Sequence, residues 1–259
     1  MDLGLKGRRA LVCASSKGLG FACALALARE GVAVVINGRS GSALTAAAEA
    51  IRAATGVKVT QIVADLGDKG ARDKLIACAG DVDILVNNNG GPSPGQFANW
   101  DEDAWRNAIE MNMIPALMLI QAFLPGMQAR KFGRIVNITS AMVKTPKAPM
   151  GLSTAARTGL TAACKAMVPL VAADNVTINS LLPERFDTDR QKMIANLMVQ
   201  MKGITLEEAR AEIAGTIAAK RFGDPAEFGD ACAYLCSAQA GFISGQQLQL
   251  DGGTYEGLV

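Results

Sequence analysis

Short apolar runs rich in β-branched residues alternate with longer alanine-rich stretches along most of this 259-residue chain. The short runs have the character of strands, and the stretches between them favour helix. Nearly continuous apolar strands that alternate with helices are typical of a parallel sheet, because each crossover returns across the sheet and covers one of its faces. The expected strands are RRALVCA, VAVVIN, VKVTQIVA, DILVNN, GRIVNITS, VTINSLLP and QQLQLDGG.

This alternation predicts the fold class α/β. We expect residues 1–259 to form a single-domain, Rossmann-like, doubly wound parallel sheet of about seven strands with helices on both faces. No internal repeat or linker-like tract divides the sequence. Residues 183–224 interrupt the regular pattern. An insertion after a strand of such a sheet is well placed to cover a ligand, so we expect a lid at about 184–222.

Charge and residue usage exclude several functions. The net charge of +2 gives no overall attraction to nucleic acid or to an anionic membrane. No apolar window has the length of a membrane span, and the first residues lack the pattern of an export signal, so we expect a cytoplasmic location. Histidine is absent and the six cysteines are scattered. We therefore expect no metal site, no disulfide framework and no serine-hydrolase triad.

A glycine-containing loop, CASSKGLG, follows the first strand at residues 13–20. Gly18 and Gly20 allow the backbone to approach a pyrophosphate, and the start of the following helix, near Gly18, attracts an anion. The second strand ends at Asn37 and Arg39, which is where dinucleotide folds hold the adenosine ribose. An arginine there suits a 2′-phosphate, so Arg39 and Lys17 favour NADP(H), with NAD(H) possible.

Further motifs occur in a fixed order along nearly the whole chain. They are CASSKGLG, Asp65-Leu66, NNNG at 87–90, IEMNMIPA, VNITSAM, INSLLPERFDTD and FISGQQLQLDGG. Together they resemble the short-chain dehydrogenase/reductase (SDR) family, in particular its 3-oxoacyl-[acyl-carrier-protein] reductase branch. The resemblance implies that the cofactor is contacted by Ala14, Ser16, Lys17, Gly18, Leu19, Gly20, Asn37, Arg39, Asp65, Leu66, Asn88, Asn89, Gly90, Arg157, Pro183, Phe186 and Thr188.

The same resemblance implies a catalytic set with two replacements. The family's helix asparagine corresponds to Asn112 and its active-site serine to Ser140. Its Tyr-x-x-x-Lys pair aligns with Ser153 and Arg157. Tyrosine occurs elsewhere only at positions 234 and 255, so a shifted alignment does not supply a phenol. Ala14 also replaces the first glycine of the loop, which is expected to weaken cofactor binding if the backbone there has positive φ.

Three explanations remain for the missing phenol, because serine is a weak acid and arginine a poor proton donor. In the first, a water held by Ser140, Ser153 and Arg157 relays the proton, and fixed charge stabilises the alkoxide. In the second, the substrate or a loop residue supplies it, with Lys144, Lys147, Glu184 and Asp187 as candidates. In the third, the protein binds a dinucleotide without turnover. A halohydrin-dehalogenase-like reaction is less favoured, because the loop still has a dinucleotide-binding pattern.

The expected function is therefore that of an atypical NADP(H)-dependent oxidoreductase. It would reduce a ketone, aldehyde or 3-oxoacyl group, or oxidise the corresponding alcohol. A basic set near the expected cavity mouth favours an anionic substrate if its members converge, although solvated surface charge also explains such sets. Its members are Lys144, Lys147, Arg185, Arg190 and Lys192. The C-terminal segment resembles the family's last strand, which implies a homotetramer or a dimer.

Overall fold

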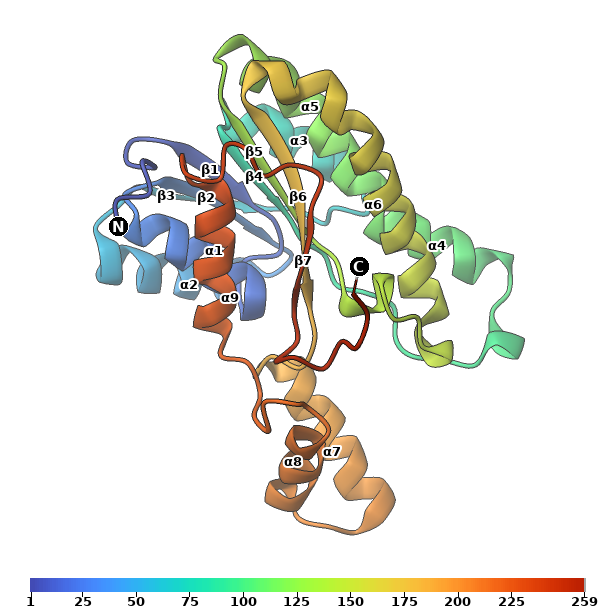
Figure 1. Cartoon of the computed structure of the whole chain (residues 1–259). Helices are drawn as coiled ribbons and strands as arrows, with labels where there is room; N and C mark the ends of the chain where they lie inside the picture. The colour runs from blue at the N-terminus through green and yellow to red at the C-terminus, as the bar shows by residue number, and fades with distance from the viewer. Residues whose placement is uncertain (259) are drawn as a thin grey trace.

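The structure is a computed structural model that describes residues 1–258. Within that range one seven-stranded sheet has the order β3-β2-β1-β4-β5-β6-β7, and every neighbouring pair is parallel (Figure 1). The sheet confirms all seven predicted strands. Their bounds are β1 Arg9–Val12, β2 Ala33–Gly38, β3 Val59–Val63, β4 Ile84–Asn87, β5 Gly133–Ile138, β6 Val176–Pro183 and β7 Gln247–Leu250.

Helices cover both faces of the sheet, as the doubly wound pattern predicts (Figure 1). Helices α1, α2 and α9 pack on one face, and α3, α5 and α6 pack on the other. The described α-helices are α1 Gly18–Arg29, α2 Gly41–Thr55, α3 Lys69–Ala79, α4 Glu102–Asn112, α5 Ile114–Ala129, α6 Gly151–Val171, α7 Asp189–Lys202, α8 Leu206–Gly215 and α9 Pro225–Cys236.

Two hydrophobic cores explain why the central strands are apolar at successive positions. Successive side chains of a strand point to opposite faces. Accordingly, Val12 and Ile36 lie in the core beneath α1 and α2, whereas Leu11 and Val35 lie in the core beneath α3 and α5. All four side chains are almost completely buried. Both faces must therefore be hydrophobic, which gives continuous apolar runs rather than an alternating pattern.

The long apolar run through α4 and α5 belongs to the second core. Residues Glu102–Ala129 form the one described helical stretch that is long and apolar enough to cross a membrane by length and composition. The helix is interrupted at Met113, which has φ −121° and ψ −57°. From α5, Leu119, Ile120 and Phe123 pack beneath the sheet. Packing within the domain thus accounts for part of this apolar run, of whose most apolar window 39% is buried.

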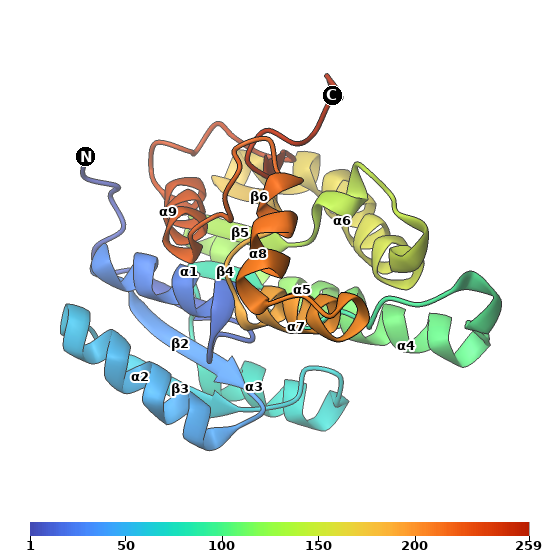
Figure 2. The same cartoon turned by 90° about the horizontal axis from the view of Figure 1, so that it is seen from below.

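The chain reverses its direction of winding between β1 and β4, which places a crevice at their carboxyl ends. Strands β2 and β3 extend the sheet on one side of β1, and β4 to β7 extend it on the other. Ligands of open α/β sheets bind in such a crevice. Helices α7 and α8 follow β6 and lie beyond this end of the sheet, where the view from below shows them in front of the strands (Figure 2).

Candidate active site

A cavity of about 420 Å³ lies at the carboxyl end of the sheet. Its walls come from the turn after β1, the loops after β4, β5 and β6, and the first turns of α6 and α7. Residues as far apart in sequence as Lys17 and Ile194 therefore share one site. The predicted site residues that line it are Lys17, Gly18, Leu19, Asn88, Asn89, Gly90, Ser140, Ser153, Arg157, Pro183, Phe186 and Thr188.

The glycine turn presents the start of α1 to this cavity. Helix α1 begins at Gly18, and its N-cap residue Lys17 makes no side-chain capping bond. The N–H groups of the first turn are therefore left for a ligand, and the positive end of the helix dipole favours an anion. Gly18 has φ +61°, and a Cβ at Gly20 would lie 2.4 Å from the carbonyl oxygen of Ala14. Glycine is thus needed at both positions.

Ala14 has the positive φ on which the prediction of weaker cofactor binding depends. Its φ is 44°, in the region where a Cβ is disfavoured. Its carbonyl oxygen accepts a bond of 3.3 Å from the Asn88 amide, and its N–H donates to the Asn37 amide oxygen at 3.4 Å. These bonds hold the turn in place while the methyl group strains it.

We predict that Ala14→Gly raises stability, because glycine adopts positive φ without this strain. The expected gain is about 1 kcal/mol, after the greater flexibility of glycine in the unfolded chain is subtracted. For a chain of this size that corresponds to a Tm increase of about 2 °C or more. Thermal unfolding followed by circular dichroism measures it, with Ala50→Gly on the exposed side of α2 as a control that should lower Tm. An unchanged or lower Tm for Ala14→Gly would contradict the strain at this residue.

At the end of β2, one polar residue is buried in structural hydrogen bonds and another is exposed to solvent. Asn37 is buried, and its amide group donates to the carbonyl oxygens of Ile62 and Ala64 at 3.2 and 3.1 Å. Its side chain is thus used to join β2 to β3 and to the glycine turn. Arg39 is exposed, and its Nη1 lies 4.0 Å from Asp65 Oδ2. Arg39 is therefore the residue that remains available to a ligand at this end.

Three further predicted residues lie near the end of β2, outside the wall of the main cavity. Ser16 Oγ lies 3.3 Å from the position that a Cβ at Gly38 would occupy, so it fills the space between the turn and β2. Asp65 accepts the Gly67 N–H at 2.9 Å. The Leu66 side chain is buried in the second core. These residues surround the cavity without lining it.

Arg157 is the most constrained polar side chain in the cavity. It lies one helical turn after Ser153 on α6, so both side chains occupy the same face. Its Nη1 donates to the carbonyl oxygens of Ile138 and Thr139 at 2.8 and 3.0 Å. Its Nη2 donates to the Asn89 carbonyl oxygen at 3.2 Å, and its Nε donates to Ser153 Oγ at 3.2 Å. The guanidinium thus ties the loops after β4 and β5 to α6.

Burial lowers the pKa of Arg157 but leaves its guanidinium charged at neutral pH. Desolvation of its guanidinium, with the like charge of Arg190 nearby, lowers the pKa of Arg157 to about 10. The group therefore remains positive at neutral pH, and no ion pair joins it to a carboxylate of the described residues. A buried positive charge without a carboxylate partner favours an anion or a developing negative charge beside it.

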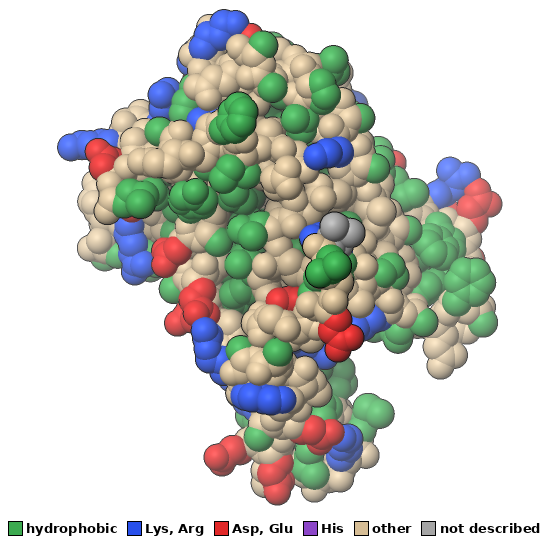
Figure 3. Space-filling model, in the orientation of Figure 1, with side chains coloured by type: hydrophobic (Ala, Val, Ile, Leu, Met, Phe, Trp, Pro, Cys, Tyr) green, Lys and Arg blue, Asp and Glu red, His purple; other side chains and the backbone are tan. Residues whose placement is uncertain are grey.

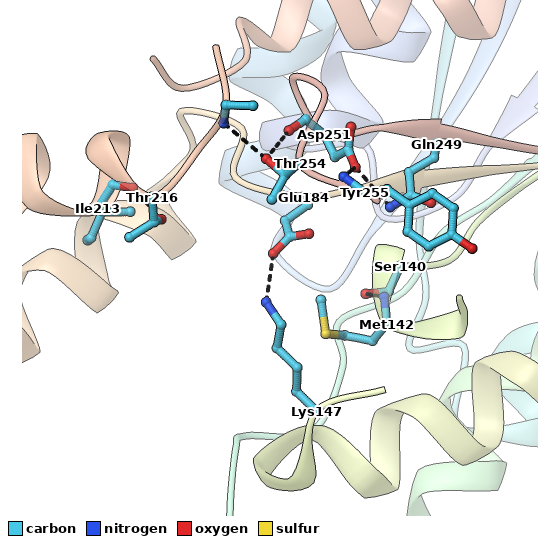
Figure 4. Close-up of polar contacts among 11 residues, drawn as sticks. Ser140, Met142, Lys147, Glu184, Ile213, Thr216, Gln249, Asp251, Thr254 and Tyr255 are labelled. Carbon is cyan, nitrogen blue, oxygen red and sulfur yellow. Dashed lines mark hydrogen bonds and ion pairs between the residues drawn. The ribbon is translucent and has the colours of Figure 1, made fainter. Parts of the chain in front are cut away.

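Two serine hydroxyls face the same space. Ser153 is 5% exposed and accepts the Arg157 Nε–H, which leaves its hydroxyl hydrogen to donate. Ser140 follows β5 and accepts the backbone N–H of Met142 at 3.2 Å (Figure 4). The hydrogen of Ser140 is likewise available to an acceptor. The site therefore presents two serine O–H donors beside the Arg157 cation.

Behind Arg157 lies a second, much smaller cavity of about 20 Å³. It is lined by Asn87 and Asn112, whose amide oxygens are both buried without a hydrogen-bond partner among residues 1–258. Asn112 donates from its amide nitrogen to the Ala108 carbonyl oxygen at 3.4 Å. A polar cavity of this size has room for about one water molecule, which would satisfy both oxygens. Asn112 thus lies behind the main cavity rather than in its wall.

Two ion pairs neutralise part of the charge at the mouth of the cavity. Lys147 pairs with Glu184 at 3.1 Å, as the dashed contact in Figure 4 shows, and Lys17 pairs with Asp189 at 3.0 Å. Of the basic set expected from the sequence, Lys147, Arg185 and Arg190 line the cavity. Lys144 and Lys192 do not: the former lies 5.4 Å above the Tyr255 ring, and the latter lines a groove beside α1.

Neither tyrosine contributes to the wall of the cavity within the described residues. Tyr255 lies near the loop that carries Ser140 and Met142 (Figure 4). Its hydroxyl, however, is 2.3 Å from the position that a Cβ at Gly257 would occupy, so it points along the C-terminal segment. Tyr234 is half exposed on α9. Among the described residues, the hydroxyl groups that line the cavity consequently belong to serine and threonine, and none of them is a phenol.

Comparison with known proteins defines the class. Over residues 13–255 the chain matches the family described as enoyl-(acyl carrier protein) reductase. It is 31% identical over 255 residues to a 3-oxoacyl-[acyl-carrier-protein] reductase of Haemophilus influenzae, with 97% of this chain and 99% of that protein covered. It is 30% identical over 256 residues to dehydrogenase/reductase SDR family member 4 of Bos taurus, with 96% and 88% covered. The chain belongs to the short-chain dehydrogenase/reductase family of oxidoreductases.

Solved structures agree with this assignment. The L-sorbose reductase of Gluconobacter frateurii, in complex with NADPH and L-sorbose, has a TM-score of 0.95 and 27% identity, with 100% of both chains covered. An NADPH-dependent reductase involved in bacilysin biosynthesis has a TM-score of 0.90 and 29% identity, with 97% of this chain and 99% of that chain covered. The Rossmann-like SDR fold predicted from the sequence is thereby confirmed.

Proposed function

We propose that this protein is an NADP(H)-dependent reductase of carbonyl compounds in which Ser153 and Arg157 occupy the positions of the family's tyrosine and lysine. One observation carries the proposal. The uncapped start of α1 opens into the same cavity as Ser140, Ser153 and Arg157. A pyrophosphate held at this helix would therefore belong to the same ligand-binding space as these donors.

The residues present fit a dinucleotide. The first-turn N–H groups of α1 suit the pyrophosphate, Arg39 suits a 2′-phosphate, and Thr188 faces Gly18 with its Cγ2 3.9 Å from the position of a Cβ there. When bound, the cofactor supplies a hydride to the carbonyl carbon. Relatives of known structure support this choice, since the L-sorbose reductase and the actinorhodin polyketide ketoreductase were both solved with NADPH.

The protein's own groups then act on the carbonyl oxygen. Ser140 and Ser153 donate hydrogen bonds to it, and the positive charge of Arg157 stabilises the negative charge that develops there. A water held between these groups delivers the proton that the oxygen gains, because Arg157 keeps its own proton at neutral pH. The reaction is thus expected to depend mainly on electrostatic stabilisation.

The loop residues considered as proton donors are engaged elsewhere. Glu184 is paired with Lys147, Asp187 is paired with Arg210 at 2.8 Å, and Lys144 lies against the Tyr255 ring. These contacts favour the water-relay explanation over a loop donor. Helices α7 and α8, with the loops around them, form the proposed lid at 184–222, since Arg185, Phe186 and Arg190 from this segment already line the cavity.

An assay of substrate turnover distinguishes this proposal from the second candidate, which is a dinucleotide-binding protein without catalytic activity. That candidate is supported by the absence of a phenol from the wall of the described cavity. NADPH oxidation should be followed with a panel of ketones, aldehydes and 3-oxoacyl thioesters. We expect reduction of at least one class. NADPH binding without turnover of any class would favour the silent protein, and failure to bind either nucleotide would contradict both.

We predict that Arg39→Asp shifts cofactor preference toward NADH. The exposed guanidinium of Arg39 has only a distant contact with Asp65, so it can bind a 2′-phosphate, which a carboxylate would repel. The ratio of kcat/KM for NADPH to that for NADH should fall about tenfold or more, as expected for the loss of a charge-assisted contact. Lys74→Asp, an equal charge change on the exposed side of α3, is the control and should leave the ratio unchanged. An unaltered ratio in Arg39→Asp would remove this residue from the cofactor site.

We also propose that the protein assembles as a homotetramer or dimer through the edge formed by β7. Large apolar side chains are exposed at Leu170 on α6, at Phe242 before β7 and at Leu248 within β7. Hydrophobic side chains are visible on the face that carries β7 and α9 (Figure 3). An exposed edge strand with apolar side chains favours pairing with a second copy.

A further inference from the structure

Three polar side chains meet around Gly91, immediately after the NNNG motif. A Cβ at Gly91 would lie 3.4 Å from Arg157 Nη2, 3.4 Å from Ser153 Oγ and 3.7 Å from Arg190 Nη1. All four residues line the main cavity. The absence of a side chain at Gly91 therefore leaves this group of donors facing one small region of the cavity.

The donors at this point are not fully used by the protein. Four of the five N–H groups of Arg157 are directed to Ile138, Thr139, Asn89 and Ser153, which leaves one on Nη2, the atom beside Gly91. The Ser153 hydroxyl accepts from Arg157 and retains its hydrogen. Arg190 adds a guanidinium from the first turn of α7. Each of these groups can donate to an acceptor in the cavity.

The charge around Gly91 is positive and is not neutralised by the protein. The two carboxylates in the cavity wall, Glu184 and Asp189, are paired with Lys147 and Lys17. Arg157, Arg185 and Arg190 form no ion pair with any carboxylate among residues 1–258. Burial and the charge of Arg190 also lower the pKa of Arg157, as expected when two cations are close together.

We propose that Arg190 and Arg157 bind a carboxylate of the substrate, so that this protein reduces small carbonyl compounds that carry a carboxylate, that is, oxo acids. A planar guanidinium matches the two oxygens of a carboxylate, and the Arg157 N–H on Nη2 that has no protein acceptor adds a second donor beside Gly91. Arg190 is exposed and comes from the proposed lid, whereas Arg157 is buried, so the anion would join the lid to the body of the domain. This inference rests on the proposed function in taking the cavity as the substrate site.

Measurements of acid and ester binding, made under conditions that prevent reduction, test the inference. Calorimetric titrations would use the protein saturated with NADP⁺, which cannot reduce a ketone, and also the protein without nucleotide. The probes are 2-oxobutanoate and 4-oxopentanoate, each beside its neutral methyl ester. We expect at least one acid to bind about tenfold or more tightly than its ester, and this preference to weaken as salt is added.

Substitutions test whether Arg190 causes the preference for the acid over its ester. Arg190→Gln should remove most of the preference for the acid, and Arg190→Lys should retain part of it. Arg106→Gln on α4, which is not among the residues of the cavity wall, should retain all of it. Equal binding of acids and esters by the wild type, or an undiminished preference in Arg190→Gln, would overturn the inference. Failure of NADP⁺ to bind would instead count against the proposed function, while the nucleotide-free titrations would still test the anion site.

Discussion

The double replacement Ser153→Tyr with Arg157→Lys is expected to raise kcat for ketone reduction by about 100-fold or more. A positioned general acid contributes about 10²- to 10⁴-fold, and serine supplies almost none of this at neutral pH. Ser153 lines the main cavity, which has room for a larger side chain beside Gly91 if the exposed Arg190 moves aside. Lysine retains a positive charge and three donors for the carbonyl oxygens that Arg157 now contacts.

The matched control is Ser153→Phe with Arg157→Lys, which adds the ring without the hydroxyl. Steady-state kinetics with NADPH and a simple ketone would compare the two double variants with the wild type. A gain in the tyrosine variant alone assigns the effect to the phenol. Intact NADPH binding with no gain in kcat would show that the cavity is adapted to another chemistry, and would contradict the proposed role of Ser153.

The substitution Arg157→Met is expected to have the second-largest effect, on stability as well as on activity. It removes the donors to Ile138, Thr139 and Asn89, so three carbonyl oxygens near the cavity lose a partner. Loss of buried hydrogen bonds of a charged group destabilises by about 3 kcal/mol or more. Urea unfolding should show this decrease in the free energy of unfolding, and kcat should fall to background.

The exposed Arg190→Met serves as the control for stability, because its guanidinium lies at the cavity edge and should change the free energy of unfolding by less than about 1 kcal/mol. Arg157→Lys should recover part of the stability. If Arg157→Met unfolds at the same urea concentration as the wild type, the network that joins α6 to the loops after β4 and β5 does not stabilise the fold.

The fold could be predicted from the sequence because its pattern is local and repeated. Seven apolar runs became seven parallel strands, and the loop CASSKGLG became the turn before α1. Each of these features depends on residues a few positions apart. The φ of Ala14 could be stated only as a condition, because an alanine in a glycine motif does not reveal whether the backbone has changed; the structure shows φ 44°.

The site was less predictable where long-range contacts decide the role of a side chain. Asn37 lies at the expected end of β2, yet its amide is used by Ile62 and Ala64. Gly91 was not identified from the sequence, although it follows directly after NNNG. Arg190 was one of five basic residues, and only the structure distinguishes it from Lys192, because Arg190 lines the main cavity and Lys192 lines the groove beside α1. Sequence spacing does not fix such contacts.

Titration of the wild-type protein with NADPH tests the central claim most directly, since the whole account depends on a dinucleotide held at the start of α1. Isothermal titration calorimetry is predicted to show saturable binding of one NADPH per chain with a Kd in the micromolar range. Gly18→Asp, which places a carboxylate at the start of that helix, should abolish binding. Absence of saturable NADPH binding by a folded wild-type protein would contradict the account.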